Sequence, residues 1–321
     1  MKCLVVLASV ILAINAASVE ELWAQFKENH GRQYRNIREE ETRFNFFKQN
    51  VQRIEEHNAK YEKGETSYYR GINRFSDKSR EEIHAMLNTS RANRPILTSG
   101  VEYKPSNVQV ASEVNWVNEG VVTGVKNQGD CGSCWAFSVT GTLEGQYAIK
   151  YGSLVSLSEQ DLVDCSVTYG TAGCNGGWMA LAYDYVKDNG ISTESDYPYL
   201  GYEATCAHSS SVLTVNDYVF IPEGDEYTLK DAVANVGPIS VSVYADDFFD
   251  YAGGIFDESS CSQEYDHGVL VVGYGEENGS EYWLVKNSWG ADWGDNGYIK
   301  MAREKNNQCA IASYASYTSI N

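Results

Sequence analysis

A cysteine at the start of a predicted helix is the strongest nucleophile that the sequence offers. Cys134 lies in the stretch Gln128–Ser138, and apolar or small residues recur at spacings of three and four from Ala136 to Tyr147, as they do on one face of a helix. Gly152 follows and is expected to end this helix. Because the positive end of a helix dipole favours thiolate over thiol, we expect Cys134 to be a nucleophile on a buried helix.

The same cysteine belongs to a second pattern that predicts different chemistry. Cys131 and Cys134 form a Cys-x-x-Cys pair, which is typical of a redox centre or of half a zinc site. Two histidines follow residue 109, and histidine is the most common general base near neutral pH. His208 lies in a polar stretch and is predicted to be solvated, whereas His267 directly precedes the apolar run 268–273. The local sequence therefore leaves nucleophilic, redox and metal-binding interpretations open.

The charge of the chain is negative and unevenly spread. Its 321 residues carry a net charge of −19, which gives nucleic-acid binding no electrostatic support. Residues 1–109 contain 17 Lys and Arg against 14 Asp and Glu, a net of +3, and residues 110–321 contain 8 against 30, a net of −22. A basic segment attached to an acidic body is expected to dock on it. Carboxylates that pair with its cations are expected to have lowered pKa values, so that acid loosens the contact.

The N-terminus has the pattern of a secretory signal. Lys2 precedes the apolar run Leu4–Ile14, and small residues follow, so cleavage is expected near Ala16. The run is too short to span a membrane comfortably. We therefore expect the chain to enter an oxidising compartment, in which disulfides persist.

The rest of the chain predicts three successive groups of elements. In residues 17–109, a capping box at Ser18 opens a helix that Gly31 ends, and we expect a long helix at 39–60, a strand and turn at 68–77 and an extended linker at 90–109. From Trp116 to about residue 216, helices are expected at 134–151, from 158 and at 178–188. Beyond Val219, strands are expected at 239–244, 268–273, 282–286 and 298–301. The fold class is therefore α+β.

Three motifs resemble the papain family of cysteine proteases, and the cathepsin L-like branch in particular. The first is E-x3-R-x3-F-x2-N-x3-I-x3-N, formed by Glu39, Arg43, Phe47, Asn50, Ile54 and Asn58, and its companion G-x-N-x-F-x-D is formed by Gly71, Asn73, Phe75 and Asp77. The third is Cys131-Gly-Ser-Cys-Trp135, followed after Cys134 by His267 at 133 residues and Asn287 at 153. The resemblance covers nearly the whole chain.

The resemblance implies a two-lobed papain-like fold, in which a helical lobe and a β-barrel lobe enclose the active-site cleft behind a mainly helical propeptide. It implies a signal peptide at 1–16, an inhibitory propeptide at 17–109 and a peptidase domain at 110–321. The expected protein is a monomeric secreted or lysosomal cysteine endopeptidase, made as a zymogen and activated at acid pH, without cofactor, metal or membrane anchor. Its partners are protein and peptide substrates and its own propeptide, in a lysosome or a digestive fluid.

The resemblance also assigns roles to individual residues. Cys134 is the nucleophile, His267 its acid–base partner, and Asn287 orients the imidazole under the cover of Trp289. Gln128 and the Cys134 backbone N–H form the oxyanion hole. The substrate-binding positions are Gly177, Trp178, Met179, Ser242, Tyr265, Asp266, Gly268, Trp289 and Tyr314, and the aromatic Tyr314 is expected to shorten an apolar pocket. No long insertion follows Cys174 to cap the cleft, so an endopeptidase is expected rather than an exopeptidase.

The cysteine count is odd once the signal is removed. Cys3 leaves with it and seven cysteines remain; the sequence alone does not choose among the possible pairings. The resemblance implies the pairs Cys131–Cys174, Cys165–Cys206 and Cys261–Cys309. Cys134 is then free and the redox interpretation loses its second cysteine, while two histidines are too few for a zinc site.

Some features depart from the family pattern or lie outside it. Asn115 and Gly124 stand where Asp and Pro are usual, which blurs the start of the mature chain near Val110. Asn88 and Asn278 begin glycosylation sequons, and Asn278 is expected in a polar loop at 275–281. A catalytically silent binding protein of the same fold would lack a nucleophile, base or oxyanion group, but all are present. A thiol-disulfide oxidoreductase is the remaining alternative.

Overall fold

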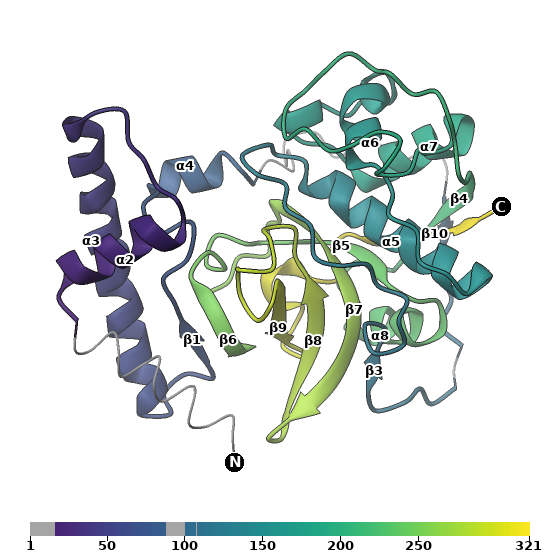
Figure 1. Ribbon diagram of the computed structural model, residues 1–321. Coiled ribbons are helices and arrows are strands. Elements are labelled where there is room, and N and C mark those ends of the chain that lie inside the picture. Colours follow the sequence, from purple (N-terminus) through teal and green to yellow (C-terminus); the bar gives the residue numbers. More distant parts are fainter. Residues whose placement is uncertain (1–16, 88–99, 107) are drawn as a thin grey trace.

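The computed structural model describes residues 17–87, 100–106 and 108–321. The expected signal peptide, the sequon at Asn88 and most of the linker at 90–109 lie outside these residues. The described chain forms a helical prosegment, a helical lobe and a sheet lobe, and Figure 1 shows the prosegment packed against one side of the sheet. The mixed helix-and-sheet fold expected from the sequence is confirmed.

The prosegment is built on two crossed helices. Helix α2 (Val19–Asn29) begins at Ser18 with the expected capping box, and α3 (Ile37–Glu62) is longer than predicted because Asn36 caps it earlier. Their contact is an aromatic cluster that includes Trp23, Phe26 and Phe47. Strand β1 (Tyr68–Arg70) and the short helix α4 (Arg80–His84) then lead toward the lobes.

The helical lobe surrounds α5 (Cys134–Tyr151), which Gly152 ends in a left-handed conformation. Helices α6 (Glu159–Cys165) and α7 (Met179–Asn189) pack on it, with single turns η2 (Ser166–Tyr169) and η3 (Gly173–Asn175) between them. The sequence predicts one apolar stripe on α5, but the helix is buried nearly all round. A Cβ at Gly141 would lie 2.7 Å from Leu270 Cδ2, so glycine allows the sheet lobe to approach α5 closely here.

The sheet lobe contains most of one mixed sheet with the order β1-β6-β9-β8-β7-β5-β10-β4-β2, in which β3 pairs with β7. Its bounds are β2 (Val101–Glu102), β3 (Val114–Asn115), β4 (Val215–Phe220), β5 (Ile239–Val243), β6 (Tyr251–Phe256), β7 (His267–Glu277), β8 (Ser280–Lys286), β9 (Tyr298–Ala302) and β10 (Ala315–Ile320), with α8 (Glu226–Asn235) and the turn η4 (Gln308–Ala310) beside it. Strands β1 and β2 come from the segment before residue 110, so this segment covers both ends of the sheet.

The hairpin between β7 and β8 is tighter than predicted. The polar stretch 275–281 is expected to be a loop, but Glu276 pairs with Glu281 and Glu277 with Ser280. Asn278 and Gly279 alone form the turn, with φ of 53° and 81°, the left-handed conformations that a two-residue hairpin requires. Asn278 is exposed at the tip, and its glycosylation stays a prediction.

The described chain contains three disulfides, and each joins two segments of the same lobe. They join Cys131 to Cys174, Cys165 to Cys206 and Cys261 to Cys309, so the pairing implied by the resemblance is confirmed. Among the described residues, Cys134 is the cysteine outside a disulfide. Within the same residues, no helix has both the length and the apolar character needed to cross a membrane.

Candidate active site

The N-terminus of α5 meets the start of β7. Cys134 is the first residue of α5 and is fully buried. A Cβ at Gly268 would lie 3.1 Å from the backbone nitrogen of Trp135, so glycine lets the strand come unusually close to the helix. His267 immediately precedes this glycine. The close approach therefore brings the histidine of one lobe beside the cysteine of the other.

The imidazole of His267 is held by neutral groups. Its Nε2 lies 2.7 Å from Asn287 Oδ1, which also accepts from the Ser288 backbone N–H at 2.8 Å. Asn287 follows the end of β8, and β7 and β8 are antiparallel neighbours, so the start of one lies beside the end of the other. Since Oδ1 accepts, Nε2 carries the hydrogen and Nδ1 is the nitrogen left for Cys134. Nδ1 has no hydrogen-bond partner among the described residues.

The His267 ring is shielded from water. Trp289 stacks on it at 4.7 Å between ring centroids, and the side chain is fully buried. Burial lowers the pKa of His267 to about 4, although the hydrogen bond to Asn287 opposes this shift. With this pKa the isolated ring is neutral in mild acid and is able to accept a proton.

The side-chain amide of Gln128 is fixed beside Cys131. Its Nε2 donates to the Cys131 carbonyl at 2.9 Å and to the carbonyl of Met86, in the prosegment, at 3.3 Å. Its Oε1 accepts from Ser288 Oγ at 2.7 Å. The amide is completely buried. A main-chain carbonyl of the prosegment therefore occupies the donor that the sequence analysis assigns to the oxyanion hole.

Five expected substrate-binding residues form one cluster around the start of α7. The Trp178 ring lies 5.0 Å from Tyr314 and 5.9 Å from Tyr265, and Ser242 Oγ lies 3.9 Å from Met179 Sδ. Tyr314 is 1% exposed. These aromatic and small side chains form one largely buried apolar cluster, which we call the apolar site.

The remaining expected positions lie elsewhere around the cleft. A Cβ at Gly177 would lie 2.6 Å from the Trp135 ring, so this glycine lies flat against α5. Asp266 Oδ1 accepts from the Ala245 backbone N–H at 2.9 Å, so it holds the loop after β5. Asp266 is therefore directed toward that loop.

Four residues that support the site escaped the sequence analysis. Tyr199 donates to the Gln128 carbonyl at 2.8 Å and lies 2.6 Å from Ser133 Oγ, while Phe220 packs on Tyr314 at 5.7 Å. Ser288 and Met86 contact the Gln128 amide, as described above. Ser288 lies between Asn287 and Trp289, so its position next to two expected site residues could have indicated its role. The other three residues reach the site through long-range packing.

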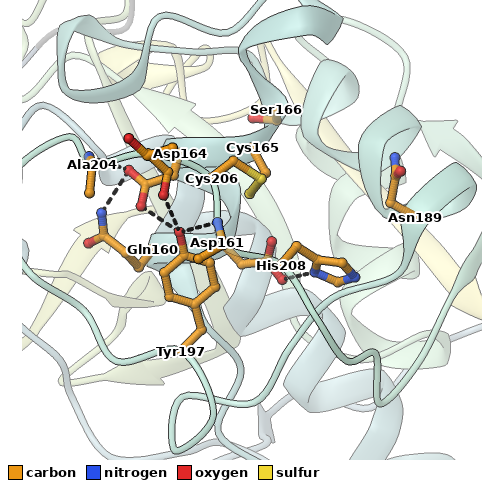
Figure 2. Close-up of a disulfide and its surroundings, with 12 residues drawn as sticks. Gln160, Asp161, Asp164, Cys165, Ser166, Asn189, Tyr197, Ala204, Cys206 and His208 are labelled. Atoms are coloured by element: carbon orange, nitrogen blue, oxygen red, sulfur yellow. Dashed lines mark hydrogen bonds and ion pairs between the residues drawn. A yellow bond between two sulfur atoms is a disulfide. The ribbon is translucent and has the colours of Figure 1, made fainter.

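The prediction that His208 is a solvated loop residue is wrong. Its Nδ1 lies 2.7 Å from Asp161 Oδ2, and only 20% of its side chain is exposed. Figure 2 shows the pair beside the disulfide between Cys165 and Cys206. Because Asp161 lies one helical turn before Cys165 on α6, the disulfide brings the loop that carries His208 onto this carboxylate.

Behind the site, a buried group of charges joins the lobes. Lys126 Nζ lies 2.9 Å from Glu144 Oε1 and 2.7 Å from Glu159 Oε1, and Lys286 Nζ donates to Thr123 Oγ1 at 3.0 Å. Burial raises the pKa of Glu159 and lowers that of Lys286. These groups come from both lobes and line a cavity that also reaches Asn287, so they support the loop that carries Asn287 from behind.

The prosegment docks on the peptidase lobes through cations and one aromatic side chain. Arg70 lies 3.5 Å and Arg53 3.7 Å from Asp250. Phe75 contacts Trp289 at 5.3 Å and Phe249 at 5.5 Å between ring centroids. The predicted pairing of a basic segment with an acidic body is confirmed.

The pKa of one carboxylate at this interface, Asp247, shifts in the direction opposite to the prediction. We expected lowered pKa values for carboxylates that face prosegment cations. For Asp247 burial raises the pKa, although Arg80 and Arg70 oppose this shift. Desolvation is the larger effect there because the prosegment covers the carboxylate as it supplies the charge.

This geometry agrees with the match of the chain to two protein families. Residues 110–319 match the family described as papain family cysteine protease, and residues 23–83 match the cathepsin propeptide inhibitor domain. The chain belongs to the papain family of cysteine proteases. Within it, the chain is a cathepsin L-like protease that carries its propeptide.

Several relatives share the full length of the chain. It is 49% identical to the cathepsin L-like proteinase of Phaedon cochleariae over 99% of both chains, and 47% identical to digestive cysteine proteinase 2 of Homarus americanus over 96% and 97% of the two chains. The solved structure of digestive procathepsin L 3 from the larval midgut of Tenebrio molitor is 45% identical, with a TM-score of 0.88, over 94% of this chain and 99% of that one.

Proposed function

We propose that this chain is the zymogen of a cysteine endopeptidase with Cys134, His267, Asn287 and Gln128 as its catalytic residues. The observation that carries the proposal is the hydrogen bond of 2.7 Å between His267 and Asn287. His267 begins β7, the strand that touches the start of the Cys134 helix. Residues 1–16 are the signal peptide, 17–109 the inhibitory propeptide and 110–321 the peptidase domain in this proposal.

The first chemical step is attack on a peptide carbonyl. The Cys134 thiol gives its proton to Nδ1 of His267, and the thiolate forms a bond to the carbonyl carbon. The carbonyl oxygen becomes an oxyanion that accepts from Gln128 Nε2 and from the Cys134 backbone N–H. The imidazolium then gives its proton to the leaving amine as the C–N bond breaks.

The second step returns the enzyme to its starting state. His267 removes a proton from water, and the hydroxide attacks the thioester that links the acyl group to Cys134. The oxyanion forms at the same donors, and its collapse releases a carboxylic acid and the thiolate, which takes the proton back from His267. Asn287 holds the ring in one tautomer through both steps, and Trp289 keeps water away from their hydrogen bond.

The contacts of the prosegment support latency. The Met86 carbonyl accepts from Gln128, so the oxyanion donor is not available to a substrate. Phe75 covers Trp289. Removal of the prosegment exposes both. Acid supports removal because protonation of carboxylates lowers the net charge of −22 on residues 110–321 that attracts the basic prosegment, although the raised pKa of Asp247 acts in the opposite direction.

The place of action is the secretory route, ending in a lysosome or a digestive fluid. The expected leader and the three disulfides support an oxidising route. The names of the Homarus americanus and Tenebrio molitor relatives include the word digestive, which favours a digestive fluid for this enzyme.

Covalent labelling tests the catalytic assignment. After acid activation, an epoxide inhibitor is expected to alkylate Cys134, and peptide mapping by mass spectrometry identifies the site. Cys134→Ala is expected to lose hydrolysis by about 10⁴-fold or more while its thermal unfolding stays close to that of the wild type. A label on another residue, or activity in Cys134→Ala within about tenfold of the wild type, contradicts the assignment.

Tyr314 gives the apolar site a testable selectivity. It lies against Trp178 and is almost completely buried, so it shortens the pocket that takes the second residue before the cut. Substrates with Val or Leu are expected to be preferred over Phe, since a mismatch of one or two methylene-sized groups changes selectivity by about 1–3 kcal/mol.

The measurement compares kcat/KM for matched Phe and Val peptides on the wild type and on Tyr314→Ala. The variant is expected to move the ratio toward Phe by about fivefold or more. Tyr317→Ala, which changes a half-buried tyrosine three residues away on β10, is the control and is expected to leave the ratio unchanged. An unchanged ratio in Tyr314→Ala would show that Tyr314 does not line the pocket.

A further inference from the structure

Two aspartates after β5 hold cations of the prosegment. Arg80 NH1 lies 3.0 Å from Asp246 Oδ1 and donates to the Asp246 carbonyl at 2.9 Å. His84 Nε2 lies 2.8 Å from the same Oδ1, and Arg80 NH2 lies 3.8 Å from Asp247 Oδ1. We call Asp246 and Asp247 the acidic shelf. Its side chains are 19% and 30% exposed in this contact, so the two carboxylates are partly desolvated.

The acidic shelf lies on the His267 side of the cleft. Val243, the last residue of β5, pairs in register with His267 on β7. The Ala245 N–H is held by Asp266, the residue before His267. Phe249, just beyond the shelf, stacks on Trp289 at 4.8 Å, and Trp289 stacks on His267.

This position determines which part of a substrate the shelf meets. His267 protonates the leaving amine, so the residues after the cut extend along the His267 side. The apolar site around Trp178 and Tyr314 lies at the helical lobe and takes residues before the cut. A side chain that reaches the acidic shelf therefore belongs to the leaving group.

The occupant of the shelf shows what chemistry it takes. Arg80 and His84 lie on α4, and two residues beyond His84 the Met86 carbonyl reaches Gln128. One continuous stretch of peptide thus places cations on the shelf while its backbone enters the oxyanion site. The cations that face Asp247 are Arg80 and Arg70, both from the prosegment, alongside the carboxylates of Asp246 and Glu258.

We propose that the processed enzyme selects substrates with Arg or Lys in the first few residues after the cut, through Asp246 and Asp247. This rests on the proposed function. Removal of residues up to about 109 takes away Arg80 and His84, and residues 110–321 have a net charge of −22 with 8 cations. Asp246 keeps its contact of 3.4 Å with Tyr244 Oη, but the shelf loses the cations of the prosegment and lies next to an open cleft.

A peptide series tests the proposal on enzyme processed from the full-length precursor. Each peptide has the same acyl part, with Val before the cut, and an alanine leaving group into which Arg, Lys, Ala or Glu is placed at each of the first three positions in turn. The kcat/KM values are measured at about pH 6, where an ordinary aspartate is ionised. At one or more positions, Arg and Lys are expected to exceed Ala by about threefold to tenfold, with Glu below Ala.

Variants assign this preference to the shelf. Asp246→Asn and Asp247→Asn are each expected to bring the Arg/Ala ratio close to one, whereas Asp217→Asn, which removes an exposed carboxylate that pairs with Lys187, leaves it unchanged. The wild-type ratio is also expected to fall as NaCl is raised, since partly exposed ion pairs are screened. This salt series provides a test even where a variant fails to fold.

The outcomes separate the two proposals. Failure of the all-alanine peptide, together with no labelling of Cys134, contradicts the proposed function. Normal hydrolysis of that peptide with equal rates for Arg, Ala and Glu at every position overturns the shelf alone. The shelf is also overturned by an Arg preference that survives both Asn variants and high salt.

Discussion

The peptidase domain places its two histidines in opposite environments. His267 is fully buried and its partner is the neutral amide of Asn287. His208 is partly exposed, and its partner is the carboxylate of Asp161, which is fully buried. Asp161 also accepts from Tyr185 Oη at 2.7 Å and from the Ser192 N–H at 2.8 Å.

The difference explains why one ring suits catalysis and the other suits structure. The carboxylate of Asp161 ties the His208 ring to one place. A neutral amide orients the ring without fixing its charge, so the proton of His267 is free to move to and from Cys134. The hydrogen bond of Nε2 to Asn287 leaves Nδ1 of His267 for this exchange, and burial lowers the pKa of the ring to about 4.

The largest expected effect is on kcat/KM, when each of the two histidines is replaced in turn by a residue that does not titrate. His267→Ala is expected to lower kcat/KM by about 10⁴-fold or more, because the nucleophile loses its base and the leaving amine its acid. His208→Gln is expected to stay within about threefold of the wild type, because its ring touches no part of the cleft. The precursors are processed by a tagged wild-type enzyme that is then removed, and hydrolysis is measured under initial-rate conditions.

Thermal unfolding of both variants serves as the control. His267→Ala is expected to keep its fold, whereas His208→Gln loses stability. A loss of hydrolysis in His208→Gln without unfolding would break the division between the two histidines.

The second expected effect is a loss of stability when Asp161, the partner of His208, is replaced. Asp161→Asn removes a buried carboxylate that accepts three hydrogen bonds, and the free energy of unfolding is expected to fall by about 2–4 kcal/mol. Hydrolysis at a temperature where the variant is folded is expected to stay within about threefold of the wild type.

Urea unfolding of the inhibitor-blocked enzyme measures this loss. Asp196→Asn, an exposed carboxylate of the same lobe that accepts from Thr193 Oγ1, is the matched control and is expected to change stability by less than about 0.5 kcal/mol. Equal shifts in the two variants would show that the three buried contacts of Asp161 together add nothing specific to stability.

Much of the architecture was predictable because its signals are local. The Ser18 capping box, the Gly152 stop and the Ser158 cap each involve residues within one or two helical turns, and the structure has all three. The family motifs predicted the propeptide, the papain-like fold and the disulfide pairs. The resemblance to the family supplies long-range contacts that no single stretch of this sequence could predict.

The features that escaped prediction depend on contacts between distant residues. His208 reaches Asp161 across 47 positions, and the contact exists because a disulfide joins their neighbours. Met86 meets Gln128 across 42 positions through the docking of the whole prosegment. The turn at Asn278 was missed for a different reason, since the polar residues around it suggested a loop while the Asn-Gly pair required a tight hairpin.

The smallest expected effect extends the comparison to a histidine of the prosegment. His57 on α3 resembles His267, since its Nε2 lies 3.0 Å from a neutral acceptor, the Tyr68 carbonyl. Burial lowers the pKa of His57 from its usual 6.5, and the nearby Arg70 lowers it further, while the Tyr68 hydrogen bond, Asp250 and Glu258 oppose the shift. Its ring packs on Tyr68 at 4.2 Å, and Tyr68 packs on Phe256 of the sheet lobe at 4.7 Å.

The lowered pKa of His57 makes the packing of the prosegment on the sheet lobe weaker in acid. The folded prosegment binds fewer protons at His57 than the unfolded segment, so the contribution of the neutral ring is fully present above pH 6.5 and is lost as the pH falls below that value toward the folded pKa. His57→Gln keeps a side-chain N–H donor for the Tyr68 carbonyl but removes the titration. Its prosegment is therefore expected to open less readily than that of the wild type in acid, and equally readily near neutral pH.

Processing of precursors that carry Cys134→Ala measures this opening without self-cleavage. A trace of active enzyme is added, and the ratio of the His57→Gln rate to the wild-type rate cancels the pH dependence of the added enzyme itself. The ratio is expected to be close to one at about pH 7 and to fall about twofold or more by about pH 5. Lys60→Gln, an exposed cation one turn further along α3, is the control and is expected to keep its ratio constant. A constant ratio for His57→Gln as well would mean that acid acts on the prosegment through other titrating groups, and that a neutral partner does not by itself make a buried histidine responsive to pH.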